Sequence, residues 1–192
     1  MKPMNNFRND LAFSHACEEM DCWREIYSLA FPTMSAMVDH RQDGQHQRAG
    51  IDRTIVLANG KSITVDEKVR RKDYGDVLLE YISNDRTQSP GWIEKHLLCD
   101  FIAYAVLPTG KAYLLPVIQL QIAWQKNKES WMDMATSKRN GYRLCSAKND
   151  YYNTQSISVP VRDLFAAIGS ALRVDFTPLN EGSYEQLELP VF

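Results

Sequence analysis

Hydrophobic and polar residues alternate along the chain in a way that predicts both strands and helices. Between residues 50 and 71, apolar side chains recur at every second position on either side of Asn59-Gly60, as in two strands joined by a tight turn. Residues 15–30 and 118–135 instead have apolar side chains near helical spacing. Helices and strands in this order predict an α/β or α+β fold in which helices flank a mixed central β-sheet.

The other predicted elements are shorter. Apolar runs bounded by turn residues predict strands over residues 34–38, 76–83, 100–108, 111–117 and 156–160, and helices over residues 92–99 and 161–172. Ser14 is expected to cap the first helix and Pro32 to end it. Residues 41–50 and 84–91 are expected to be loops. We expect one domain over residues 1–192, with a core over about 14–170 and an irregular tail from Arg173.

The turn at Asn59-Gly60 decides which side chains share a face of the hairpin. A two-residue turn would pair Ala58 with Lys61 and would mix apolar and charged residues on both faces. A three-residue turn with Gly60 in the left-handed conformation pairs Leu57 with Lys61 instead. One face then holds the apolar residues Ile51, Ile55, Leu57, Ile63, Val65 and Val69, interrupted by Arg53 and Glu67. The other face holds Asp52, Thr54, Ser62, Thr64, Asp66, Lys68 and Arg70, and this separation favours the second register.

The polar face of the hairpin combines two carboxylates with an ammonium group. In the favoured register Asp52 lies opposite Asp66, where two ionised carboxylates repel each other unless a cation lies between them. Lys68 follows two residues later on the same face. Carboxylate oxygens suit Mg²⁺ or Mn²⁺, which would polarise a phosphodiester and lower the pKa of a bound water. Lys68 would orient that water or stabilise the charge growing on the phosphate oxygens. The cluster predicts metal-assisted hydrolysis.

The order Asp52, Asn59-Gly60 turn and Asp66-Glu67-Lys68 resembles the D…(D/E)-x-K signature of the PD-(D/E)xK nuclease superfamily. This superfamily includes restriction endonucleases and archaeal Holliday-junction resolvases. The resemblance covers residues 14–118 and implies a restriction-endonuclease-like core: a helix, a three-stranded meander, a further helix and another strand. It also implies that Asp52 and Asp66 bind the metal, that Lys68 is catalytic, and that the main-chain carbonyl of Glu67 is a third ligand.

Other acids are candidates for the same site. Many such enzymes add a glutamate from the first helix, for which Glu18 and Glu19 are the local candidates. Glu80 on the next predicted strand allows a second assignment, in which it joins Asp66 and Lys68 while Asp52 is peripheral. A solvated strand surface with a cross-strand salt bridge and no chemistry is the remaining interpretation of these charges.

Charge limits how the chain would hold a nucleic acid. Its 192 residues have a formal net charge of −2, so a polyanion must be attracted by a local patch. Residues 61–72 include five basic and two acidic side chains, and we predict that the basic ones outside the acid cluster contact phosphates: Lys61, Arg70, Arg71 and Lys72. Protection of an edge strand against aggregation is the alternative role of these charges.

Several classes of protein are not favoured by the sequence. The four cysteines and four histidines have no spacing typical of a zinc site. No apolar run is long enough for a membrane span, and the N-terminus lacks a secretion signal, so we expect a cytoplasmic protein without a membrane partner.

The sequence therefore predicts a Mg²⁺- or Mn²⁺-dependent nuclease that acts on DNA rather than RNA, as a monomer, a homodimer or part of a larger complex. One alternative is a catalytically silent nuclease-fold module that binds nucleic acid or protein in a DNA-processing or mobile-element system. Another is a sheet protein of a different class whose charged strand is an oligomer or partner interface.

Overall fold

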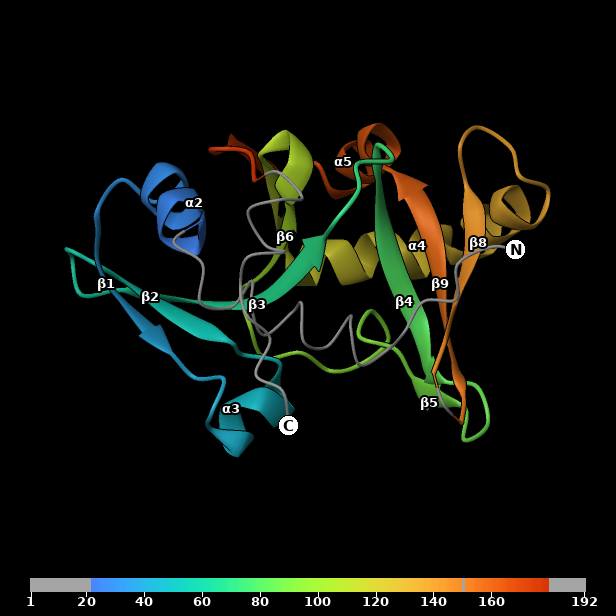
Figure 1. Ribbon diagram of the computed structural model, residues 1–192, viewed down its shortest axis with the longest axis horizontal. Helices are drawn as coiled ribbons and strands as arrows, with labels where there is room; N and C mark the ends of the chain where they lie inside the picture. Colours follow the sequence, from blue (N-terminus) through green and yellow to red (C-terminus); the bar gives the residue numbers. More distant parts are fainter. Residues whose placement is uncertain (1–21, 150, 180–192) are drawn as a thin grey trace. The chain divides into compact units, whose positions relative to one another are not determined.

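The computed structural model describes residues 22–149 and 151–179, whose contacts divide into two compact units (Figure 1). One unit consists of Tyr74–His96 and Ile118–Gly169, and the other of residues 22–73, Leu97–Val117 and 170–179. Each unit contains its own β-sheet and its own helices. The predicted α+β class with a mixed central sheet is confirmed, whereas the expectation of one domain stays a prediction.

The unit that contains the hairpin is built on a six-stranded sheet in the order β1-β2-β3-β6-β7-β10. Its strands are β1 (Met34–Asp39), β2 (Arg53–Leu57), β3 (Ser62–Arg70), β6 (Phe101–Val106), β7 (Lys111–Pro116) and β10 (Leu172–Asp175). Neighbouring strands are antiparallel except for β3 and β6, which run parallel. The sheet is therefore mixed. The parallel pairing of β3 with β6 requires the long connection between them.

Helix α2 (Cys22–Ala30) packs on one face of this sheet. Its buried residues Trp23, Ile26 and Tyr27 join a core cluster with apolar side chains of the strands. The strand residues of this cluster are Ile55, Val65, Ala103, Ala105, Ala112, Leu114 and Val174. They point to the same side because side chains alternate along a strand. Even-numbered residues of β3, including Asp66 and Lys68, consequently lie on the face away from α2.

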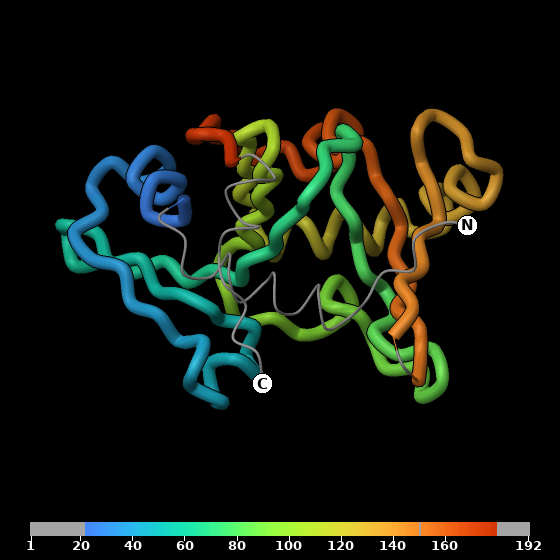
Figure 2. Tube along the Cα trace, in the orientation of Figure 1, coloured from blue at the N-terminus to red at the C-terminus, as the bar shows by residue number. Residues whose placement is uncertain are grey.

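The register of the β2–β3 hairpin is the one that the apolar pattern favours, and its path can be followed in Figure 2. Arg53 pairs with Val65 and Ile55 with Ile63. At the turn, the Leu57 N–H donates to the Lys61 carbonyl at 2.8 Å, and Gly60 has φ +79°. Since a side chain is disfavoured at this positive φ, glycine allows the bulged turn that sets the pairing.

The other unit has a four-stranded antiparallel sheet in the order β5-β4-β9-β8. Its strands are β4 (Asp76–Asn84), β5 (Ser89–Pro90), β8 (Arg143–Lys148) and β9 (Asn153–Pro160). Its helices are α4 (Val117–Thr136), whose first residue belongs to the hairpin unit, and α5 (Val161–Ile168). Trp124 and Trp131 of α4 contact Tyr81 and Tyr142 with ring centroids 6.4 and 6.5 Å apart. Trp124, Trp131 and Tyr142 of this row are buried in the unit's core.

Some predicted elements were wrong. Residues 92–99 form a turn followed by irregular structure instead of a helix, and the Lys95 carbonyl accepts a hydrogen bond from the Gln121 side chain at 2.7 Å. The family resemblance implies a helix between the meander and the next strand. The described connection between β3 and β6 contains β4 and β5 and no helix. The predicted helix over 161–172 ends earlier, at Ile168, because Gly169 adopts a left-handed conformation.

Other elements were missed. The predicted loop over 41–50 contains helix α3 (Gly44–Ala49), and the Asp43 carboxylate caps it by accepting from the Gln45 N–H at 2.8 Å. Strand β8 is largely exposed and so lacks an apolar pattern. Strand β10 lies in the tail predicted to be irregular and pairs with β7. None of the helices in the described ranges is long and apolar enough to span a membrane.

Candidate metal centre

The candidate site lies at the start of β2 and along the second half of β3. Asp52 immediately precedes β2, and its N–H donates to the Val65 carbonyl at 2.8 Å. Its own carbonyl accepts from the His40 N–H, also at 2.8 Å. The pairing of β2 with β3 ends at Arg53 and Val65, and Asp52 extends it through its bond to Val65. The main chain of Asp52 is therefore held from both neighbouring strands.

The structure brings Asp52, Asp66 and Lys68 together. Lys68 Nζ lies 2.5 Å from Asp66 Oδ1 and 3.4 Å from the Glu67 carbonyl oxygen. The Asp52 carboxylate accepts a hydrogen bond from the Glu67 N–H at 2.7 Å. The Asp66 side chain is only 7% exposed, whereas that of Lys68 is 31% exposed. The acid is thus buried beneath a lysine that solvent can reach.

The electrostatics of the cluster reflect this burial. Burial, together with the negative charge of Asp52, outweighs the attraction of Lys68 and raises the pKa of Asp66 to about 6. Burial by itself lowers the pKa of Lys68, but the Asp66 and Asp52 carboxylates outweigh it and hold that pKa above its ordinary value. Lys68 therefore stays protonated at neutral pH. With both acids ionised, two negative charges face one positive charge, and the excess negative charge favours a cation.

A second ionic cluster lies directly behind the first, on the face that packs against α2. The Glu67 Oε1 atom accepts from Arg53 Nε at 2.7 Å and from the Tyr27 hydroxyl at 2.8 Å. The side chains of Glu67 and Arg53 are 5% and 7% exposed. Burial is the main cause that raises the pKa of Glu67 to about 7, against the effect of Arg53. The two residues that interrupt the apolar face of the hairpin are therefore partners in a buried ion pair.

Sequence reasoning missed several polar groups near the acids. The Asp100 carboxylate accepts from the Thr64 N–H at 2.7 Å, so it lies beside the start of β3. His40 Nε2 is 2.9 Å from Thr54 Oγ1, and its ring stacks on His46 with centroids 3.9 Å apart. Thr54 and Thr64 share the face of Asp66 by strand alternation. Only the pairing of β3 with β6 would have pointed to Asp100, since nothing in its local sequence does.

The predicted phosphate-binding residues do not form one patch. Lys61 is exposed at the hairpin turn, five residues before Asp66 along β3, which corresponds to about 16 Å. Arg70 lies at the other end of β3, where its guanidinium is 3.3 Å from the Tyr104 hydroxyl. Arg71 and Lys72 follow directly after it. Arg70, Arg71 and Lys72 thus stay together on the Lys68 side of the acids, whereas Lys61 is separate.

The additional candidate acids lie in the other unit or outside the described residues. Glu80 lies on β4 in the other unit, so its assignment to this site stays a prediction. Glu18 and Glu19 lie outside the described residues.

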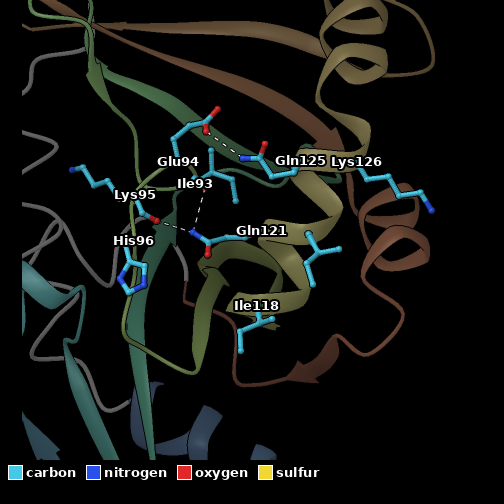
Figure 3. A pocket seen from close by; sticks show the side chains of 9 residues that line it. Ile93, Glu94, Lys95, His96, Ile118, Gln121, Gln125 and Lys126 are labelled. Carbon is cyan, nitrogen blue, oxygen red and sulfur yellow. Dashed lines mark hydrogen bonds between the residues drawn. The ribbon is translucent and has the colours of Figure 1, made fainter.

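A groove of about 720 Å³ lies in the unit that contains α4 (Figure 3). It is lined by residues 93–96 and by one side of α4, including Ile118, Gln121 and Ile122. Glu94 is the acid in its wall, and its carboxylate accepts from Trp124 Nε1 at 2.9 Å and pairs with Lys128. This pairing gives the acid a structural role in the wall of the groove.

The oxygen atoms around Asp66 are of the type that magnesium prefers. Within residues 22–149 and 151–179, no three side chains of His, Cys, Asp and Glu are grouped so that they could hold a metal. Mg²⁺, however, is usually held by one or two carboxylates, and substrate phosphates and water complete its coordination. Asp52 and Asp66 supply two carboxylates, and the Glu67 carbonyl supplies a third hard oxygen.

The raised pKa values predict how the metal-free protein responds to pH. In the unfolded chain the two acids have their ordinary pKa values, 3.8 for Asp66 and 4.5 for Glu67. Both pKa values are higher in the folded protein, which therefore binds both protons more tightly than the unfolded chain does. Stability from these groups is complete below those ordinary values. It is lost as the pH rises through about 6 for Asp66 and about 7 for Glu67. Each pKa unit corresponds to about 1.4 kcal/mol, so the free energy of unfolding should fall by several kcal/mol.

Urea unfolding in EDTA at pH values from 4.5 to 8 measures this dependence. The Glu67→Gln variant cannot titrate at this position and should lose the slope between about pH 6 and 7, where the folded-state pKa of Asp66 has already been passed. An equal slope in the variant and the wild type would contradict the assignment to Glu67.

Comparisons with known proteins give no further constraint on this site. The PD-(D/E)xK resemblance therefore depends on the motif and the hairpin geometry described above. No protein-family model, no curated protein and no solved structure matches this chain.

Proposed function

We propose that this chain is a Mg²⁺-dependent nuclease of the PD-(D/E)xK type that hydrolyses DNA phosphodiester bonds in the cytoplasm. One observation carries the proposal: the Asp52 and Asp66 carboxyl groups interact with each other, and the Lys68 ammonium lies 2.5 Å from the Asp66 carboxylate. This is the arrangement that the (D/E)-x-K signature requires.

The proposed roles follow from the chemistry of each group. Asp52, Asp66 and the Glu67 carbonyl would hold the ion, which when bound supplies a Lewis acid that polarises the phosphate. Lys68 is a hydrogen-bond donor and a positive charge, since its pKa is raised. It would orient the attacking water and stabilise negative charge on the phosphate oxygens, but it would not remove a proton. The burial of Asp66 strengthens these electrostatic interactions by excluding bulk water.

A purely structural role explains the cluster less well. A surface ion pair contributes about 0–1 kcal/mol, whereas burying an acid opposite another acid lowers stability. Lys68 alone cannot neutralise both carboxylates. An arrangement that lowers the stability of the metal-free protein is expected where ligand binding compensates for it.

Arg70, Arg71 and Lys72 are the proposed contacts to the DNA backbone. They follow Lys68 along the strand and its continuation, so a phosphate chain passing over the acids would meet them next. Binding through such residues weakens steeply as salt concentration rises. Lys61, at the far end of the strand, is expected to contribute less.

The proposal is tested with purified protein and end-labelled duplex, single-stranded and branched DNA, with RNA of the same sequence in parallel. Cleavage is expected in Mg²⁺ or Mn²⁺ and none in EDTA, with at least one DNA substrate cut faster than RNA. Binding without cleavage in any metal, together with no heat of Mn²⁺ binding in calorimetry, would instead support the silent binding module.

A further inference from the structure

We propose that Tyr27, Arg53 and the Glu67 side chain form a positioning cluster that holds the candidate active site from behind. This inference rests on the proposed nuclease function and extends it to three residues that would touch neither metal nor substrate through their side chains. Tyr27 comes from α2, Arg53 from β2 and Glu67 from β3. They meet at the Glu67 Oε1 atom, with distances of 2.8 and 2.7 Å.

The geometry of adjacent residues couples the two clusters. Asp66 and Glu67 are neighbours on β3, where side chains alternate between faces, and Asp52 directly precedes Arg53, the first residue of β2. The Asp52 and Asp66 carboxyl groups interact with each other, whereas the side chains of Arg53 and Glu67 pair on the face of α2. Each pair of neighbours therefore directs an acid to the site face and an ion-pair partner to the α2 face. Because the Arg53–Glu67 ion pair joins the two strands, it restrains the backbone segments that carry Asp52 and Asp66.

The main chain of Glu67 transmits this restraint directly. Its N–H donates to the Asp52 carboxylate at 2.7 Å, and its carbonyl lies 3.4 Å from Lys68 Nζ. Any shift of Glu67 would therefore move a contact of Asp52 and a contact of Lys68 together. The Tyr27 hydroxyl fixes the Glu67 side chain from a helix whose residues Trp23 and Ile26 are buried in the core.

The cluster is also arranged to add no net charge behind the acids. Arg53 neutralises Glu67, and a second acid, Asp39, lies 3.7 Å from the Arg53 guanidinium and pairs with Arg41. The Glu67 Oε2 atom is buried and makes no hydrogen bond within the described part of the chain. Apolar residues of similar size would serve stability as well or better. A partly satisfied ion pair at this position is better explained by a geometric role.

The Tyr27→Phe variant tests the inference, because it removes only the hydroxyl that donates to Glu67. The ring stacking of residue 27 on Trp23 should remain. We expect kcat to fall about tenfold, while KM for DNA changes by less than about twofold. This pattern is typical of a variant that loses an interaction made only in the transition state. In the metal-free protein, hydrogen exchange of the Glu67 amide should become about tenfold faster, since that amide holds Asp52.

The matched control is Tyr81→Phe. The Tyr81 hydroxyl donates to Gln155 at 3.0 Å in the other unit, so this variant loses a comparable hydrogen bond away from the site. Its kcat and its Glu67 amide exchange should equal those of the wild type. Glu67→Gln keeps the size of the side chain but weakens the pairing with Arg53, and it should resemble Tyr27→Phe in both measurements.

The outcomes separate this inference from the proposed function. Wild-type rates and wild-type Glu67 exchange in both Tyr27→Phe and Glu67→Gln would overturn the positioning role and leave the nuclease intact. An equal slowing by Tyr81→Phe would also overturn it, because the effect would then be a general loss of stability. A wild type that neither cleaves DNA nor binds Mn²⁺ would overturn both proposals.

Discussion

Alanine in place of Lys68 is expected to lower Mg²⁺-dependent DNA cleavage by about a thousandfold or more, the range for removing a group that stabilises transition-state charge. The lysine is the cation next to Asp66, and its raised pKa keeps it charged over the working pH range. Asp66→Asn should reduce cleavage by a similar factor, because it removes a buried negative charge that would hold the metal. Single-turnover cleavage with saturating enzyme measures both effects without a contribution from DNA binding.

Controls for this prediction come from exposed residues of the other unit. Lys148 lies on β8 and Asp133 on α4, both with exposed side chains. Lys148→Ala and Asp133→Asn change charge by the same amounts as the site variants but should cleave at the wild-type rate. Circular dichroism of all four variants should match that of the wild type. Cleavage within about threefold of wild type in both Lys68→Ala and Asp66→Asn would eliminate the assignment of the site.

Replacing Arg53 with methionine is expected to destabilise the protein by about 3–5 kcal/mol, the usual effect of removing one partner of a buried ion pair. The Arg53 side chain is 7% exposed, so its contact with Glu67 is largely shielded from solvent. The variant would leave the Glu67 carboxylate buried with only the Tyr27 hydroxyl as a hydrogen-bond donor to its side chain in the described region. Urea unfolding at pH 8, where Glu67 is ionised, measures the loss.

The double variant Arg53→Met/Glu67→Leu separates this effect from a loss of packing. It removes both charges and should recover most of the stability lost in Arg53→Met, because no unpaired charge is left in the core. A loss below about 1 kcal/mol in the single variant would mean that the ion pair is hydrated in solution. The double variant should still cleave DNA poorly if the cluster positions Asp52 and Asp66.

The hairpin was predictable because its determinants are local. Gly60 allows the bulged turn, and only one register separates Ile55, Ile63 and Val65 from the charged residues. Elements that depend on distant partners were less predictable. Strand β10 forms by pairing with β7, and the carbonyl of Lys95 bonds to Gln121 of α4 in place of helical partners. Apolar patterning carries no information on either contact.

The same distinction applies to the candidate site. By itself the sequence determined that Asp52, Asp66 and Lys68 share one face, since turn chemistry and the two-residue period of a strand act within the hairpin. Only the tertiary structure decided that Asp66 is buried, that Arg53 and Glu67 pair beneath Tyr27, and that Asp100 reaches Thr64 from 36 residues away. These features require the packing of α2 and the parallel pairing of β3 with β6. Such contacts join distant segments, and the free energy that selects them comes from the whole core and not from any local stretch of residues.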